Sequence, residues 1–321
     1  MAAIKIHLPQ ANTFIVNCPL YIVNYTFFYT ERHMATTYNN LYLDIRQQLR
    51  KAGIEAATLE ARELVCFGTG KSREELQRDG GLYASPELER TVRELVDRHL
   101  AGEPVAYLIG EWEFYGLPLD ISRDVLIPRP DTEVLAEQAI GHIKTLGECR
   151  VLDLCAGSGC IGLAVAAQAP GARVVLGEYS DAALKICRQN IRRNSLTARV
   201  VPMQADALDK PGKALGEFQC IVCNPPYIPH DDIAGLDGSV RDYEPHLALD
   251  GGDDGLDFYR AISEKWRAAL APRGRLYFEV GIGQADAVLR IMRTQGFGDI
   301  QIVKDLHDIP RVVFGTLCTE I

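Results

Sequence analysis

The feature that most constrains this chain is an alternation of short apolar runs and helical patterns that begins after Gly147. The apolar runs predict strands at 150–155, 173–178, 199–203, 218–223, 274–280, 299–304 and 311–316, with helices between the first five. Strands that are apolar throughout suit a sheet covered on both faces. The sequence therefore predicts an α/β fold with a doubly wound, seven-stranded sheet.

The last strand of this sheet is expected to be antiparallel to its neighbours. Only a short turn, around Asp305 to Pro310, separates the last two predicted strands. A parallel crossover needs a dozen or more residues, whereas an antiparallel pair can be joined by a tight turn.

The region before the sheet reads as helical from Thr37 to about Leu100. Apolar residues recur at helical spacing at Leu41, Ile45, Leu49 and Ala52. Gly53 is expected to end this first helix, Ser72 to Glu75 resembles a capping box, and Ser85 precedes a long helix as its cap. Residues 34–105 are therefore expected to form a small helical domain that recognises a substrate.

Residues 106–130 are expected to form a β-hairpin that links the two domains. Its apolar positions are Tyr107, Ile109, Trp112, Phe114, Tyr115, Leu117 and Leu119, of which Trp112 and Phe114 are expected in the core. Gly116 and Pro118 lie near the expected turn, and Pro128 and Pro130 end the strand pattern. Asp131 is expected to cap a helix that runs to Leu146 and opens the third region, residues 131–321.

Residues 1–33 are unlike the rest of the chain. No charged residue occurs from Gln10 to Thr30, and this stretch is near the length of a membrane span. Asn12, Asn17, Pro19 and Asn24 interrupt it and would be costly in lipid. We expect a non-native or disordered extension with the functional start at Met34 and no membrane association; a membrane anchor is the alternative.

Composition narrows the classes of partner. The 321 residues carry a formal net charge of −9, which argues against a broad, direct grip on nucleic acid. The nine cysteines lie mostly in apolar runs, as expected of core thiols in a reducing cytoplasm. Cys220 and Cys223 form a CxxC, but no second pair and no histidine at ligand spacing accompanies them, so no metal site is predicted.

The first chemical motif is VLDLCAGSGCIGLAV at 151–165, a strand, a glycine-rich turn and the start of a helix. Gly157, Gly159 and Gly162 match GxGxxG, which lets a backbone approach a ligand at a helix N-terminus. Glu178, at the end of the next strand, can accept both hydroxyls of a ribose, and Asp206 is a candidate for an adenine edge. Tight turns without a ligand, a solvated strand end and a turn-capping aspartate are the respective alternatives.

The second motif is Asn224-Pro225-Pro226-Tyr227, directly after the strand at 218–223. Ligands of open α/β sheets bind at the carboxyl ends of the strands, so this motif belongs beside the glycine-rich turn. The Asn224 side-chain oxygen and the Pro225 carbonyl can accept the two N–H groups of a planar amide, while Tyr227 covers its face. The arrangement is typical of methyl transfer to a planar nitrogen; a plain turn is the alternative.

These motifs together resemble those of the release factor glutamine methyltransferase family over roughly residues 35–316. The matching stretches are EPVAYLIGEWEFYGLPLDISRDVLIPRPDTEVL, VLDLCAGSGCIG, CNPPYIP, YEPHLALDGGDDGLDFYRAI, EVGIGQ and KDLHDIPRVVFG. The resemblance implies a class I fold that uses S-adenosylmethionine as methyl donor. It also implies cofactor contacts from Cys155, Ala156, Gly157, Ser158, Gly159, Glu178, Ala207 and Asn224, and substrate contacts from Asn224, Pro225, Pro226 and Tyr227.

Three positions depart from the family pattern or limit what it implies. Cys155 stands where glycine is common, and Glu178 where aspartate is frequent. Ala207 could contribute only its backbone to a cofactor site.

The resemblance implies methylation of the side-chain N5 of a glutamine, in the GGQ motif of peptide chain release factors. We expect the enzyme to be a cytoplasmic monomer. A glutamine of a ribosomal protein and the N6 of adenine in DNA are the alternative substrates. A nicotinamide oxidoreductase would leave the NPPY motif unused, and a non-catalytic binding protein would need only half of the site.

Two further features have open interpretations. Arg129 and Asp131 are candidates to shape the mouth of the cofactor site, with a structural salt bridge as the alternative. The long stretch 228–256 is acidic and without an expected fold of its own, which suits a basic protein partner or, alternatively, a solvated loop.

Overall fold

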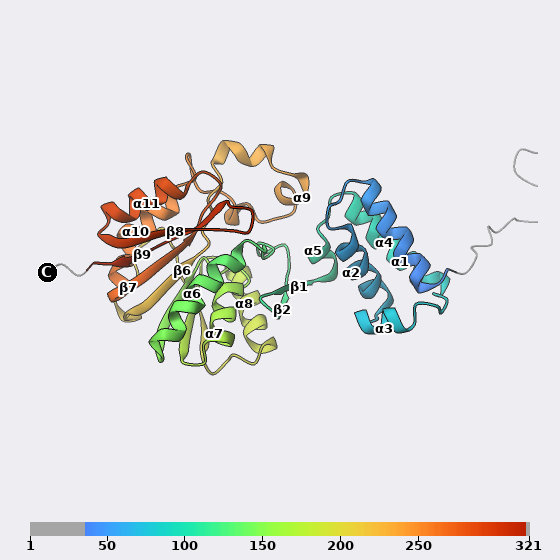
Figure 1. Cartoon of the computed structure of the whole chain (residues 1–321), viewed down its shortest axis with the longest axis horizontal. Coiled ribbons are helices and arrows are strands. Elements are labelled where there is room, and N and C mark those ends of the chain that lie inside the picture. Colours follow the sequence, from blue (N-terminus) through green and yellow to red (C-terminus); the bar gives the residue numbers. More distant parts are fainter. Residues whose placement is uncertain (1–35, 319–321) are drawn as a thin grey trace, which may run out of the picture. The chain divides into compact units, whose positions relative to one another are not determined.

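The computed structural model describes residues 36–318 (Figure 1). The predicted extension at 1–33 and the predicted start at Met34 lie outside these residues. The chain divides into two compact units, with the division between Asp97 and Arg98. Among the described residues, no helix is long and apolar enough to cross a membrane.

The first unit is helical, as predicted. It contains α1 (Tyr38–Lys51), α2 (Ala57–Thr69), α3 (Arg73–Arg78) and the start of α4 (Pro86–Leu100). The buried face of α1 is formed by Tyr38, Leu41, Ile45 and Leu49, which confirms the period read from the sequence. Ala52 is exposed, because α1 ends before it and this residue serves only as the C-cap.

The caps predicted in this unit are confirmed. The Ser72 hydroxyl accepts the backbone N–H of Glu75 at 3.1 Å, and the Glu75 carboxylate accepts the backbone N–H of Ser72 at 2.9 Å. Ser85 likewise accepts the backbone N–H of Leu88 at 3.2 Å at the start of α4. Each bond satisfies a donor that a helix start leaves without a partner.

The expected hairpin is shorter than predicted. It comprises β1 (Glu111–Phe114) and β2 (Leu117–Asp120), which pair antiparallel. Phe114 is core as expected, whereas Trp112 is half-buried and packs against that core. Tyr107 and Ile109 were expected in the hairpin but lie in the helix α5 (Val105–Ile109). Pro104 at the N-cap and Gly110, with φ of 76°, bound one helical turn there, so local capping outweighs the strand-like composition.

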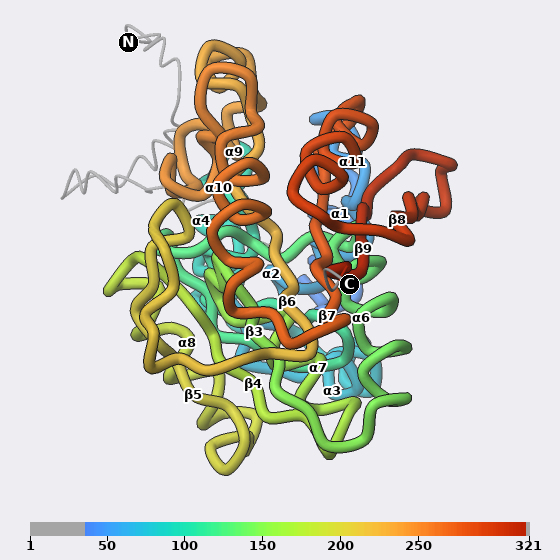
Figure 2. Tube along the Cα trace, turned by 90° about the vertical axis from the view of Figure 1, so that its left-hand side faces the viewer, coloured from blue at the N-terminus to red at the C-terminus, as the bar shows by residue number. Residues whose placement is uncertain are grey.

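The second unit contains the predicted seven-stranded sheet. Its strands are β3 (Cys149–Leu154), β4 (Ala172–Glu178), β5 (Val200–Gln204), β6 (Phe218–Cys223), β7 (Leu270–Glu279), β8 (Phe297–Lys304) and β9 (Pro310–Leu317). The order across the sheet is β5-β4-β3-β6-β7-β9-β8, which can be followed in Figure 2. The last strand, β9, is antiparallel to both β7 and β8, as the short turn before it predicted.

Helices cover both faces of this sheet. One face packs against α6 (Thr132–Leu146), α7 (Cys160–Gln168) and α8 (Asp181–Arg193). The other packs against α10 (Asp257–Lys265) and α11 (Ala285–Thr294). The prediction of a helix between β5 and β6 was wrong: only the 3₁₀ turn η1 (Lys213–Leu215) occurs there, because Pro211, Gly212 and Gly216 interrupt any longer helix.

The CxxC thiols belong to opposite faces of the sheet. Cys220 packs in the core beneath α6 and α7, whereas Cys223 packs in the core beneath α10 and α11. Side chains three positions apart on a strand point to opposite faces. The two sulfurs are therefore placed to fill two cores and not to share a metal ion.

The stretch 228–256, expected to lack a fold of its own, is folded. It contains η2 (His230–Gly235), the short helix α9 (Gly238–Arg241) and η3 (His246–Ala248), and it returns to its own start through a bridge between Ile228 and Asp250. Much of its acidity serves this structure. Asp237 accepts the N–H of Ser239, and Asp242, Asp250 and Asp254 pair with Arg241, His230 and Arg260.

Candidate functional site

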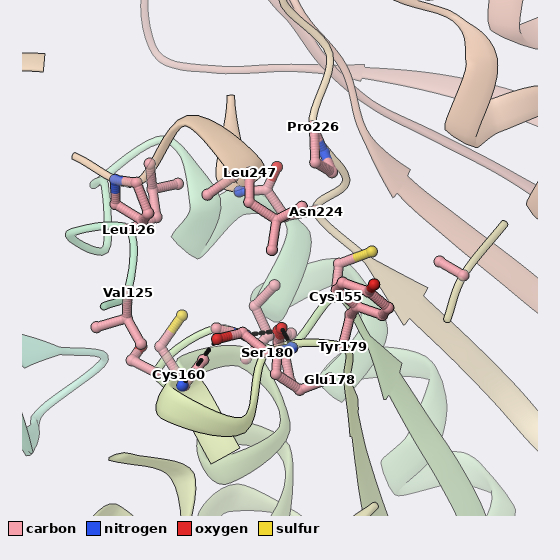
Figure 3. Close-up of a pocket in the computed structure, with 18 of the residues that line it drawn as sticks. Val125, Leu126, Cys155, Cys160, Glu178, Tyr179, Ser180, Asn224, Pro226 and Leu247 are labelled. Atoms are coloured by element: carbon pink, nitrogen blue, oxygen red, sulfur yellow. Dashed lines mark hydrogen bonds between the residues drawn. The ribbon is translucent and has the colours of Figure 1, made fainter. Parts of the chain in front are cut away.

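A cavity of about 330 Å³ lies where β3, β4, β5 and β6 end (Figure 3). Among its lining residues are nine of the predicted site residues: Cys155, Ala156, Gly157, Ser158, Glu178, Asp206, Ala207, Asn224 and Pro226. Gly159, Pro225 and Tyr227 do not line it. The sheet order explains the convergence, because β3 pairs with β4 on one side and with β6 on the other.

The glycine-rich turn brings bare backbone to this cavity. Gly157 and Gly159 have φ of 55° and 82°, in the left-handed region that glycine enters without strain. A Cβ on Gly157 would meet no atom within 4 Å, so its backbone faces open space. A Cβ on Gly162 would come within 2.3 Å of Leu176, so that glycine allows α7 to pack closely on the sheet.

Cys155 adopts the same left-handed conformation, with φ of 60°. This explains why glycine suits the position, and it shows that the cysteine is accommodated at the cost of some backbone strain. Cys155 lines the cavity beside Ala156.

Beneath the turn, Asp153 is fully buried and accepts the backbone N–H of Gly162 at 2.8 Å. Burial raises the pKa of Asp153 to about 7. Its role is to hold the start of α7 in place.

Glu178 braces the same turn from the end of β4. One carboxylate oxygen accepts the N–H of Gly157 and the other accepts that of Ser180, both at 2.8 Å (dashed lines in Figure 3). Each carboxylate oxygen has two lone pairs, so these bonds leave capacity for ribose hydroxyls. The prediction assigned Glu178 to ribose alone; the structure adds that it shapes the turn.

Asp206 and Ala207 also line the cavity, and each has an internal partner. The Asp206 carboxylate accepts the N–H of Leu208 at 2.8 Å, which is the turn-capping alternative considered for it. The Ala207 carbonyl accepts the indole N–H of Trp266 at 3.1 Å. The carbonyl oxygen has a second lone pair, so this bond does not exclude a ligand contact from the Ala207 backbone.

The NPPY segment is held on the opposite side of the cavity from Glu178, where Figure 3 shows Asn224 and Pro226 near Leu247. The Asn224 side-chain N–H donates to the Thr132 hydroxyl at 3.4 Å. Pro225 and Pro226 are buried, and Asn224 and Tyr227 are half-buried. Burial raises the pKa of Tyr227, which keeps the phenol neutral.

Gly251, Gly255 and the side-chain amide of Gln284 pack against the Tyr227 backbone and support the NPPY segment. A Cβ on Gly251 would come within 2.8 Å of the Tyr227 Cα, and one on Gly255 within 2.3 Å of the Tyr227 carbonyl oxygen. That carbonyl accepts the side-chain N–H of Gln284 at 2.8 Å. Sequence reasoning missed this support, although the glycine spacing in DGGDDG was a signal of close backbone approach.

Arg129 lines the cavity and also forms an ion pair, whereas Asp131 forms an ion pair and does not line the cavity. Arg129 pairs with Glu244, whose side chain is 1% exposed, and Asp131 pairs with Arg311 at 2.7 Å. Asp131 occupies the N-cap position of α6 but forms no capping hydrogen bond, because its carboxylate is turned to Arg311. Glu244 belongs to the acidic stretch 228–256 that was expected to face a partner or solvent, but it is buried.

The Arg129–Glu244 pair joins two segments that wall the cavity. Leu126 and Pro128 line it from one segment, and Pro245 and Leu247 line it from the other. Burial raises the pKa of Glu244, and the nearby Arg129 guanidinium opposes that rise.

The site fits a nucleoside ligand. The Glu178 carboxylate can accept ribose hydroxyls, and the bare glycine backbone lets the ligand approach closely. The apolar wall can pack against a base. Fold and site together define an α/β protein that binds a nucleoside ligand at the carboxyl ends of its strands. The fold is similar to that of the hMettl16 catalytic domain, solved with a MAT2A 3′UTR hairpin, at a TM-score of 0.50 and 18% identity over 64% of this chain and 78% of that chain.

Comparison with known proteins narrows the class. Residues 40–110 match the family model of the PrmC N-terminal domain, and residues 132–235 match that of the methyltransferase small domain. The release factor glutamine methyltransferase of Thermodesulfovibrio yellowstonii is 38% identical over 79% of this chain and 90% of its own length. The release factor glutamine methyltransferase of Geobacter sulfurreducens is 40% identical over 85% of this chain and 94% of its own length. The chain belongs to the release factor glutamine methyltransferase family, and it uses S-adenosylmethionine.

Proposed function

We propose that this enzyme transfers a methyl group from S-adenosylmethionine to the side-chain N5 of a glutamine in peptide chain release factors. The observation that carries the proposal is that Asn224 and the glycine-rich turn line one cavity. The names of relatives that are 34–40% identical support the choice of substrate. The glutamine of a GGQ motif is the target that we propose within those factors.

The cofactor would be held by the residues that converge on the cavity. We assign the backbone of 155–159, the carboxylate of Glu178, and Asp206 with Ala207 to cofactor binding, together with Asn224. When bound, S-adenosylmethionine supplies a methyl group on a positively charged sulfur. The Leu126 and Leu247 side chains, which line the cavity, would exclude water from the part of the site that holds this methyl group.

The chain's own contribution to the reaction would be to orient the target amide. An amide nitrogen is a poor nucleophile, because its lone pair is delocalised into the carbonyl group. The Asn224 side-chain oxygen and the Pro225 carbonyl would accept its two N–H groups and favour the positive charge that develops on it. Pro225 and Pro226 hold these acceptors rigidly, and Tyr227 would cover the face of the amide.

We further propose that the helical region 34–105 contacts the release factor and that the enzyme acts as a monomer in the cytoplasm. Large apolar side chains are exposed on this region at Phe67, Leu82 and Tyr83, as expected of a surface that meets another protein. All described cysteines are free thiols, which suits a reducing compartment.

The test uses three separate reactions, each with the enzyme and labelled S-adenosylmethionine. One contains purified release factors, one ribosomal proteins and one duplex DNA. Mass mapping then locates the label. We expect label on one glutamine of a release factor. Label on a ribosomal protein or on adenine instead would overturn the assignment in favour of those two alternatives, of which DNA is disfavoured by the net charge of −9.

A further inference from the structure

Glu279, the last residue of β7, is a buried carboxylate that the cavity does not explain. It is 3% exposed, and within the described chain its Oε2 atom is buried without a hydrogen-bond partner. It is not among the residues that line the cavity. A buried polar group of this kind is costly, so its presence calls for a specific role.

Glu279 lies directly behind Asn224. The parallel strands β6 and β7 pair Cys223 with Phe278, so the next residue on each strand, Asn224 and Glu279, leave the sheet side by side. The side chains of Thr132 and Asn224 lie beside the carboxylate and favour its charged form. Thr132 is 2% exposed and also accepts the Asn224 side-chain N–H.

The charged residues near Glu279 form ion pairs with other groups. Arg311 pairs with Asp131 at 2.7 Å and with Asp305 at 2.9 Å, and the described residues include no ion pair to Glu279. Burial raises the pKa of Glu279 to about 7, against the opposing effects of Thr132, Arg311 and Asn224. The carboxylate therefore keeps unused hydrogen-bonding capacity next to the Thr132 and Asn224 side chains.

The chemistry of the two side chains fixes one orientation. An asparagine amide presents an acceptor at its oxygen and two donors at its nitrogen, whereas a carboxylate only accepts. A carboxylate behind Asn224 stabilises the orientation in which the amide nitrogen faces the protein. The oxygen then faces the cavity, where the proposed function needs an acceptor for the substrate N–H.

We propose that Glu279 is a positioning residue, which with Thr132 holds the Asn224 amide so that its oxygen faces the substrate. The inference rests on the proposed function for its consequence in turnover, but the orientation itself does not depend on which substrate is used.

The first experiment observes the orientation directly in the full-length protein. The side-chain NH₂ signals of Asn224 are followed by ¹⁵N NMR and are identified by their loss in Asn224→Asp. We expect them to shift with pH about a midpoint near 7 as Glu279 ionises, and to lose this dependence in Glu279→Gln. Signals that neither titrate nor respond to Glu279→Gln would overturn the proposal.

The second experiment measures turnover. Glu279→Gln is expected to lower kcat by about 10-fold to 100-fold, the usual range for a group that orients a functional side chain, and to leave the dissociation constant of S-adenosylmethionine unchanged. In an Asn224→Ala background, Glu279→Gln should cause no further loss, because both changes remove the same oriented acceptor. Additive losses would mean a merely structural role.

Ser263→Ala is the matched control. Ser263 is also fully buried, with a hydroxyl that lacks a hydrogen-bond partner within the described chain, but it does not line the cavity. It should change neither kcat nor the Asn224 signals. If the wild-type enzyme fails to methylate release factor glutamine, the proposed function is wrong, and the NMR result alone still decides the positioning role.

Discussion

The pair between Arg129 and Glu244 joins segments 115 residues apart, and its removal is the most direct test of how the cavity is built. The Glu244 side chain is 1% exposed, and its other hydrogen bond, from the Ile127 N–H, is long at 3.4 Å. Arg129→Met keeps most of the side-chain volume but leaves a buried carboxylate almost without partners.

The expected cost follows from that geometry. Removing one partner of a fully buried pair costs about 3–5 kcal/mol of unfolding free energy. The Arg129 side chain is 38% exposed, so water screens part of the interaction, and we expect about 2–3 kcal/mol. The dissociation constant of S-adenosylmethionine should also rise, because Leu126, Pro128 and Leu247 line the cavity from the two joined segments.

The loss should depend on pH. Burial already raises the pKa of Glu244 in the folded protein, and loss of Arg129 raises it further. A raised carboxyl pKa gives stability that is present below the unfolded pKa and is lost as pH rises through the folded one. The deficit of Arg129→Met should therefore be smaller at pH 5 than at pH 8.

The assay is urea unfolding followed by tryptophan fluorescence, to which the buried Trp266 contributes, with cofactor binding measured by calorimetry. Arg241→Met is the control, because the Arg241–Asp242 pair lies in the same stretch with 40% and 54% of the side chains exposed. Such a pair contributes roughly 0–1 kcal/mol. Adding Glu244→Gln to Arg129→Met should recover part of the loss. A variant as stable as the wild type at pH 8, with unchanged cofactor affinity, would refute this reasoning.

Three further outcomes are expected. Asn224→Ala should lower kcat by about 10² while cofactor affinity falls less, because one oriented acceptor is lost; near-normal turnover would contradict the mechanism. Glu178→Ala should weaken cofactor binding more than it slows saturated turnover, since ribose contacts are equally strong in the ground and transition states. An unchanged dissociation constant of S-adenosylmethionine would show that Glu178 does not belong to the site. Glu279→Gln should flatten the pH dependence of stability: the wild type loses up to about 3 kcal/mol as pH rises from about 4.5 to about 7, the folded pKa of Glu279. Parallel curves for the two proteins in urea unfolding would count against a buried, titrating Glu279; Asp153 contributes equally to both.

The local parts of this fold were predictable because their causes are local. The apolar run at 218–223 is a strand with those bounds, and the capping box at Ser72 depends on residues three positions apart. The short turn before β9 excludes a parallel crossover whatever surrounds it. The NPPY segment and the glycine-rich turn could be placed together, because both follow strands and ligands bind at strand ends.

Errors arose where tertiary context or competing local signals decide. Tyr107 and Ile109 have strand-like composition, but Pro104 and Gly110 bound a helical turn around them. The stretch 228–256 reads as an acidic loop, yet Glu244 is buried against Arg129 and Gly251 packs on Tyr227. Neither contact leaves a periodic signal in the sequence.

The sequence by itself determined the class of fold, the two chemical motifs and their meeting at one sheet edge, because these depend on periodicity and on short-range backbone geometry. Only the tertiary structure decided what stands behind the motifs. Glu279 lies beside Asn224 because β7 pairs with β6, and Arg129 meets Glu244 because the stretch after β6 folds back over the cavity. Such pairings join residues far apart in the chain, and the burial that gives their charges energetic weight exists only once the chain has folded.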